Sequence, residues 1–316
     1  MESGSRMAAE KDIAEKLLFE AEDVFADILN VLLFDGEEMI LPHALTPTRQ
    51  RSQLKIDGAL HEQERDVSKI WMDGGVRFAL FGLENQTAVE PDMVLRVFSY
   101  DGASYKEQVV HNRQKDAAKW PPYPVITAVL YFGRKRWNGP RTLKSLLDSR
   151  IPPKLEPFVN DYKLHVFEIS YLSPEKVAMF KSDFRIVADF FTQTCQSGEY
   201  VPSRETIVHV EETLKLMAAL TGDSRFTESA DEAVRKGEPV AMCDVLDRAE
   251  NRGIQKGRAE GRAEGRLNTL FELALDGVLS NAEAAARANL PEQEFARRAE
   301  EYGRLLETGR SRPLSQ

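Results

Sequence analysis

Cysteine and long apolar runs are scarce in this chain of 316 residues. The two cysteines, Cys195 and Cys243, lie far apart without a disulfide-like spacing, which favours a reducing compartment and plain buried thiols. No run of about 18 apolar residues occurs, and the first residues, MESGSRMAAEKD, lack the apolar stretch of a secretion signal. We therefore expect a cytoplasmic protein that makes no contact with a membrane.

An excess of positive charge is also missing, because 42 Lys and Arg face 51 Asp and Glu and leave a formal net charge of -9. This balance argues against a polycation that coats nucleic acid, although a local basic face or a bound metal ion could still recruit phosphate. The five histidines show no metal-ligand spacing, and neither a Gly-rich phosphate loop nor a Ser-His-Asp arrangement stands out.

Apolar periodicity predicts an α/β fold in the first half of the chain. Apolar residues recur at spacings of three and four from Asp12 to Phe34, which indicates an amphipathic helix that can break near Glu22. β-branched and aromatic residues dominate four bounded runs, which predicts strands at 64–72, 76–86, 123–133 and 163–172. A periodic segment at 89–119 predicts a helix that crosses over between the second and third strands of one mixed sheet.

Composition divides the chain into three expected regions, which are a sheet-containing core at 1–172, a helical extension at 173–250, and, at 251–316, a charged glycine-repeat helix with a small helix-turn-helix-like end. In the extension, segments 180–195 and 205–220 are periodic enough for amphipathic helices. In the last region, Ser280 and Glu283 form a capping-box pattern. The many acids of the final helix match a phosphate-rich groove poorly, so DNA reading there is the weaker expectation.

The one internal repeat, KGRAEGRAEGR at 256–266, places glycine, arginine and glutamate in rows of four-residue spacing. On a helix these rows are destabilising, because like charges at that spacing repel and each interior glycine costs about 1 kcal/mol relative to alanine. A second copy of the chain could offset both penalties, since glycine rows allow close approach and an arginine row can face a glutamate row. We therefore expect a homo-oligomer formed through 253–266, with a solvated charged linker as the equally open alternative.

The stretch FALFGLENQT at 78–87 ends an apolar strand with an acid and two amides. Side chains at i and i+2 share a face of a strand, so Glu84 and Gln86 point the same way and Asn85 points oppositely. Asp66 begins the preceding predicted strand, 18 residues earlier, which allows its carboxylate to meet that of Glu84. Two carboxylates, waters and a substrate phosphate can complete the octahedral shell of Mg²⁺ and orient a water against phosphorus.

Longer stretches carry more information than this pair of acids, namely KDIAEKLLFEAEDVFADILNVLLF, RDVSKIW, FGLENQTAVEPDMVLRVFSYDGASYKEQV, PVITAVLYFG, WNGPRTLKSLLD, DYKLHVFEI and KGRAEGRAEGR. Together they resemble the recombination-promoting nuclease / putative transposase family, over about residues 10 to 265. The resemblance implies a PD-(D/E)XK restriction-endonuclease-like mixed sheet flanked by helices. It also implies Mg²⁺-dependent endonuclease cleavage of DNA, with Mn²⁺ as a second usable ion, and a bacterial role in DNA recombination, mobile elements or phage defence.

Carried over by position, the resemblance implies Asp66, Glu84 and Gln86 as catalytic residues, and Asp66, Glu84 and the backbone carbonyl of Asn85 as metal ligands. Gln86 stands where the wider superfamily has lysine, and an amide offers only hydrogen bonds to the charge that develops on phosphate. Lys69 or Arg96 could supply the missing cation. The ordinary alternatives are a solvated strand position for Lys69 and an ion pair that ties its helix to the sheet for Arg96. Asp27 of the first helix could face the site as a further acid.

A basic segment follows the third predicted strand, with seven Lys or Arg residues between Arg134 and Lys154 against one acid, Asp148. Trp137 within it could stack on a base or sugar, which would make the segment a loop that follows phosphates. The candidate nucleic-acid contacts are Arg96, Arg134, Lys135 and Arg136. A solvated basic connection with Trp137 anchored on the core is the alternative.

Two functions stay open. The first is a Mg²⁺-dependent deoxyribonuclease in which Asp66 and Glu84 hold the metal and Gln86 helps to position a hydrolytic water. The second is a catalytically weak DNA-associated or protein-interaction factor that keeps the fold and uses its C-terminal helices for assembly. A transposase in the strict sense would need three acids on a ribonuclease-H-like fold, and the spacing of Asp66 and Glu84 suits the nuclease pattern better.

Overall fold

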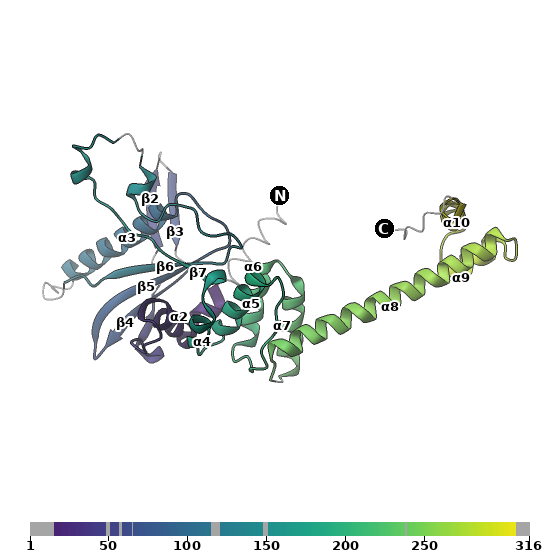
Figure 1. Ribbon diagram of the computed structural model, residues 1–316, viewed down its shortest axis with the longest axis horizontal. Coiled ribbons are helices and arrows are strands. Elements are labelled where there is room, and N and C mark those ends of the chain that lie inside the picture. The colour runs from purple at the N-terminus through teal and green to yellow at the C-terminus, as the bar shows by residue number, and fades with distance from the viewer. Residues whose placement is uncertain are drawn as a thin grey trace. The chain divides into compact units, whose positions relative to one another are not determined.

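The computed structural model describes the chain in seven ranges, which are 16–48, 51–56, 59–64, 66–114, 121–147, 151–237 and 239–307. The chain divides into two compact units, Met1–Leu246 and Asp247–Gln316 (Figure 1). The boundary between them lies inside one long helix, α8 (Met242–Leu275). The sheet and the helices of the expected extension fall together in the first unit.

The first unit is built on a five-stranded mixed sheet with the order β1-β4-β5-β6-β7. Its strands are β1 (Leu45–Pro47), β4 (Val67–Asp73), β5 (Val76–Gln86), β6 (Val125–Tyr131) and β7 (His165–Glu168). β1, β4 and β5 pair antiparallel, whereas β5, β6 and β7 pair parallel. Helix α3 (Met93–Gln114) makes the crossover from β5 to β6. The predicted α/β architecture and its crossover helix are confirmed.

A separate two-stranded sheet lies between β1 and β4 in the chain. β2 (Arg51–Ile56) and β3 (Ala59–Glu64) pair antiparallel along their whole length. The sequence prediction contained neither this hairpin nor β1, because it interpreted residues 41–50 as an irregular connection and assigned no element to residues 51–63. β3 ends shortly before Asp66, so the hairpin leads directly into the first candidate acid.

The first helical segment is broken, as predicted. Residues 16–20 are helical, Ala21 is a bend, and α2 (Glu22–Phe34) follows; residues 12–15 of the predicted helix lie outside the described residues. α2 ends at Asp35 in the left-handed conformation. Asn30 then holds the returning chain, since its side-chain amide donates to the carbonyl of Ile40 and accepts from the amide of Ile40, both at 2.9 Å.

The larger core lies on the face of the sheet that α2 covers. Phe81 and Leu83 of β5 are buried there with Phe25 of α2, and the same core continues into Phe184 of α5 and Leu214 of α6. Each such side chain contributes roughly 1.5–3 kcal/mol when it is fully buried. The expected extension therefore shares one hydrophobic core with the sheet.

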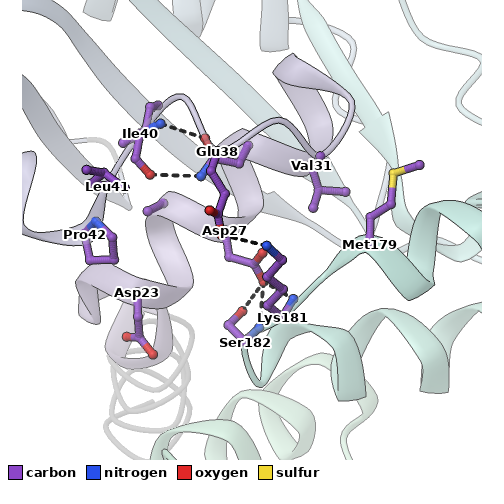
Figure 2. A pocket seen from close by; sticks show the side chains of 13 residues that line it. Asp23, Asp27, Val31, Glu38, Ile40, Leu41, Pro42, Met179, Lys181 and Ser182 are labelled. Atoms are coloured by element: carbon purple, nitrogen blue, oxygen red, sulfur yellow. Dashed lines mark hydrogen bonds and ion pairs between the residues drawn. The ribbon is translucent and has the colours of Figure 1, made fainter.

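The helices that follow the sheet are α4 (Pro174–Met179), α5 (Phe184–Gln196), α6 (Val210–Thr221) and α7 (Ser224–Lys236). Short 3₁₀ turns lie before β1 at Pro42–Ala44, between β6 and β7 at Lys144–Leu146 and Glu156–Phe158, and after β7 at Ile169–Tyr171. α5 and α6 confirm the two predicted amphipathic helices. Asp27 of α2 holds the segment between α4 and α5 (Figure 2). Its Oδ2 accepts hydrogen bonds from the amides of Lys181 and Ser182 and from the Ser182 hydroxyl, at 2.9, 2.8 and 2.6 Å.

The second unit contains most of α8, α9 (Asn281–Ala288) and α10 (Glu292–Glu307). Phe271, Ala285 and Phe295 form a small core between these three helices. The predicted capping box of Ser280 and Glu283 is present at the start of α9. Among the described helices, none combines the length and the apolar composition that a membrane crossing requires.

Candidate active site

Asp66 and Glu84 come together where β4 begins and β5 ends. Val67, the first residue of β4, pairs with Leu83, so the next step of the antiparallel register brings Asp66 beside Glu84. The backbone amide of Asn85 donates a hydrogen bond of 2.7 Å to Oδ2 of Asp66 and ties this carboxylate to the end of β5. The structure thus unites the two acids that the sequence singled out.

Glu84 is fully buried and belongs to the α3 face of the sheet. In the parallel register Glu84 aligns with Val129 and Gln86 with Tyr131, and both partners lie in a second core that packs against α3. Alternation along β5 puts Asn85 on the opposite face, where its side chain is also buried. Gln86 is half-buried at the end of the strand, so its amide lies nearer to solvent than the Glu84 carboxylate.

Arg96, near the start of α3, contacts two carboxylates at once. Its Nη2 lies 3.2 Å from Oε2 of Glu84, and its Nη1 lies 2.5 Å from Oε2 of Glu90, which precedes the helix. The hydroxyl of Tyr100, one turn further along α3, lies 3.4 Å from Nε and 3.3 Å from Nη2 of Arg96. The expected ion pair between α3 and the sheet is therefore formed, and it places a guanidinium directly on Glu84.

The charges of this cluster act on one another. Burial disfavours the charged form of Arg96, but the Tyr100 hydroxyl and the carboxylates of Glu84 and Glu90 hold the pKa of Arg96 above its ordinary value. Burial, then the charge of Glu84, raises the pKa of Tyr100; Arg96 opposes this rise and Asp66 adds to it. Because both acids act on one phenol, Asp66 and Glu84 belong to the same electrostatic site.

A buried network holds α3 in the register that presents Arg96 to Glu84. Asp101 of α3 accepts a hydrogen bond of 2.7 Å from the Thr127 hydroxyl of β6 and another from the Tyr162 hydroxyl, just before β7. A buried carboxylate is tolerated only with such partners. The network therefore connects α3 with β6 and with the segment that leads into β7.

Lys69 and Asp27 belong to the opposite face of the sheet. Lys69 is only 1% exposed, and its Nζ donates a hydrogen bond of 2.6 Å to the carbonyl of Glu20 at the break before α2. Burial lowers the pKa of Lys69, against the charges of nearby acids led by Glu22. Both sequence-based interpretations of Lys69 are wrong, because its side chain stabilises the helix break rather than reaching solvent or Glu84. The Asp27 carboxylate accepts hydrogen bonds from Lys181 and Ser182 on this face and does not reach Glu84.

The basic loop that follows β6 starts beside the site. The amide of Phe132 donates a hydrogen bond of 2.8 Å to the carbonyl of Gln86. Trp137 is buried, its ring meets the Tyr131 ring edge-on at 5.2 Å between centroids, and its Nε1 donates to the Gly139 carbonyl at 3.0 Å. Trp137 is therefore the anchor of the loop on the core and not an exposed surface for a base.

Two glycines permit this close packing of the loop. A Cβ atom at Gly133 would lie 2.1 Å from the Tyr131 hydroxyl oxygen, and one at Gly139 would lie 2.6 Å from a methyl carbon of Val89. Both distances are far below van der Waals contact, so a side chain at either position would displace its neighbours.

Glu168, at the end of β7, organises the same loop. Its Oε1 accepts a hydrogen bond of 2.8 Å from the Trp137 amide, and its Oε2 lies 2.9 Å from Nη2 of Arg141 and 3.7 Å from Nη1 of Arg136. The Arg136 guanidinium also lies over the Tyr171 ring, 3.9 Å from its centroid. Arg134 and Lys135 are exposed, so these two cations face solvent next to the site.

Sequence reasoning missed Tyr100, Glu90 and Glu168. The spacing of four between Arg96 and Tyr100 is a usable signal, since such residues share one face of a helix. Glu90 and Glu168 carry no comparable local signal, because their roles depend on how α3 and β7 meet the rest of the sheet.

The donor set at this end of the sheet consists of oxygen atoms. Within the described residues, no group of three or more His, Cys, Asp or Glu side chains is placed to hold a metal ion. The two carboxylates of Asp66 and Glu84, with the backbone carbonyl of Asn85, form a sparser set. Such a set fits Mg²⁺, which prefers oxygen ligands and usually keeps several of its waters.

Comparison of the chain with family models, with characterised proteins and with solved structures found no match.

Proposed function

We propose that the chain is a divalent-metal-dependent DNA endonuclease with a PD-(D/E)XK-like core. The observation that carries the proposal is the meeting of Asp66 and Glu84 at the adjacent ends of β4 and β5, followed by Gln86 on the face of Glu84. An acid on one strand and an acid-x-amide on the next is the arrangement that the sequence resemblance implies. The exposed cations of the β6–β7 loop lie at the same end of the sheet and suit a phosphate backbone.

In this proposal Asp66, Glu84 and the Asn85 carbonyl hold Mg²⁺ or Mn²⁺, which supplies Lewis acidity toward the phosphate and an activated water. Gln86 orients the water through its amide. The water oxygen forms a bond with phosphorus and releases a proton to solvent, one phosphorus–oxygen ester bond breaks, and the departing oxygen takes up a proton from solvent. Arg96 contributes the positive charge that a lysine at position 86 would otherwise supply.

The nucleic-acid contacts in this proposal are Arg134 and Lys135, with Arg136 held closer to the protein by Glu168 and Tyr171. Because these contacts are to phosphate, binding should weaken steeply with added salt and show little sequence dependence.

The direct test is cleavage of supercoiled plasmid by the full chain with Mg²⁺ or Mn²⁺. We expect Asp66→Asn and Glu84→Gln to lower the rate by at least about 100-fold, the scale of losing a group that acts on the reacting atoms. Glu107→Gln, an equal charge change at an exposed position of α3, is the matched control and should cut normally. Equal rates in wild type and Asp66→Asn would refute the enzyme.

The second candidate function is assembly without efficient catalysis, and one observation favours it. Residues 253–266 of α8 are all exposed. A Cβ at Gly257 or Gly261 would meet no atom within 4 Å. A helix that is polar on every side needs a partner or many ion pairs to be stable. Sedimentation of the full chain and of Gly257→Leu tests the proposed self-association, which the bulky side chain should weaken.

A further inference from the structure

Glu90 binds the same guanidinium as Glu84. Arg96 gives Nη1 to Glu90 at 2.5 Å and Nη2 to Glu84 at 3.2 Å. The two carboxylates differ in environment, since the Glu84 side chain is fully buried and that of Glu90 is 40% exposed. Arg96 is thus shared between a candidate metal ligand and a residue at the rim.

The backbone around Glu90 is well anchored. The carbonyl of Glu90 accepts a hydrogen bond of 3.3 Å from the amide of Met93 at the start of α3. The preceding residue, Val89, packs against the α3-side core that contains Trp137. The Glu90 carboxylate therefore has a defined position from which it can hold Arg96.

A divalent ion on Asp66 and Glu84 would bring two positive charges close to Nη2 of Arg96. Repulsion then favours breaking the longer contact, that with Glu84. The shorter contact with Glu90 is already formed, so the guanidinium keeps a carboxylate partner without a large movement. Tyr100 contacts Nε and Nη2 and limits how far the side chain can swing.

We propose that Glu90 is a positioning residue that retains Arg96 when a divalent ion takes over Glu84. The inference rests on the proposed metal site and adds a residue to it. In the metal-free protein Arg96 pairs with Glu84, and in the loaded protein Glu90 keeps Arg96 in place beside the site. Metal affinity consequently depends on Glu90, and it does so through Arg96.

The test is a double-mutant cycle on Mn²⁺ affinity, measured by calorimetric titration of the full chain without DNA. We expect Glu90→Gln to weaken Mn²⁺ binding by about fivefold, a coupling typical of charges in contact. Glu90→Gln in an Arg96→Gln background should change the affinity less than about twofold. Glu107→Gln is the control, because it removes an equal charge at an exposed position of α3 far along the helix from Arg96. This variant should bind Mn²⁺ as wild type does.

Glu90→Asp separates contact from charge. It keeps the negative charge but shortens the side chain, so the inference predicts a weakening similar to that of Glu90→Gln. Unchanged affinity in Glu90→Asp, or an equal loss from Glu90→Gln in both backgrounds, overturns the inference and leaves the metal site standing. A wild-type protein that binds no Mn²⁺ overturns the proposed nuclease and this inference together.

Discussion

Replacing Asp27 should cost the protein stability and leave the proposed chemistry unaffected. One oxygen of this buried carboxylate accepts three hydrogen bonds, from the Lys181 amide, the Ser182 amide and the Ser182 hydroxyl. These contacts fasten α2 to the segment that leads into α5. In Asp27→Ala the two amides lose an acceptor that is itself only 9% exposed and that lines the pocket drawn in Figure 2.

The magnitude follows from the number and kind of these bonds. A hydrogen bond to a charged group contributes about 1.5–3 kcal/mol, and the hydroxyl can turn to another acceptor, so two amides dominate the loss. We therefore expect Asp27→Ala to lower the free energy of unfolding by about 3–5 kcal/mol. Asp27→Asn keeps one oxygen acceptor without the charge and should lose about 1–2 kcal/mol.

Urea unfolding of the full chain, followed by circular dichroism and by tryptophan fluorescence, measures both losses. Ser182→Ala is the matched control, because it removes the hydroxyl and leaves both amide bonds in place. The reasoning is refuted if Asp27→Ala and Ser182→Ala lose the same free energy. Plasmid cleavage by Asp27→Asn at a temperature where it is folded should equal that of wild type; a loss comparable to Asp66→Asn would put Asp27 in the site.

Three further predictions concern Lys69, the glycine repeat and the α9 cap. Burial lowers the pKa of Lys69 in the folded protein, so between the lowered and the ordinary pKa the unfolded chain binds more protons than the folded one. The free energy of unfolding of wild type relative to Lys69→Met should therefore rise with pH across that window. Urea melts that give the same difference at every pH contradict this. Gly261→Ala meets open space and should stabilise α8 by about 1 kcal/mol, seen as higher helicity on heating, unless the glycine row is a contact between copies. Ser280→Ala should destabilise the second unit by about 1 kcal/mol in thermal melts, whereas Ser280→Asp, which can still cap the helix, should not.

Sequence patterns were sufficient where burial is local and periodic. The strand at 76–86 and the helix after it were predictable, because a short apolar run between turn residues indicates a strand and a 3.6-residue period indicates a helix. The hairpin of β2 and β3 was missed since polar residues dominate it and hide the alternation, although Asp57-Gly58 between its strands is a known hairpin signal in sequence.

The site was predictable only in part, for a related reason. Asp66 and Glu84 could be paired because neighbouring strands in a chain are usually neighbours in a sheet. Arg96 was left between two roles, and Tyr100 and Glu90 were missed, because their contacts depend on the rotation of α3 about its axis. Lys69 was misplaced since a buried lysine needs a specific acceptor, here the Glu20 carbonyl, which no local pattern reveals.

The crowding around Gly133 and Gly139 bears on how freely this protein can diverge. If the β6–β7 loop were randomised and folded variants selected, both glycines and Trp137 should persist, whereas Arg134 and Lys135 should accept nearly any residue. Exposed cations can then be exchanged while the loop keeps its course. The proposed nucleic-acid contacts and the packing of the loop therefore lie at different positions of one short segment.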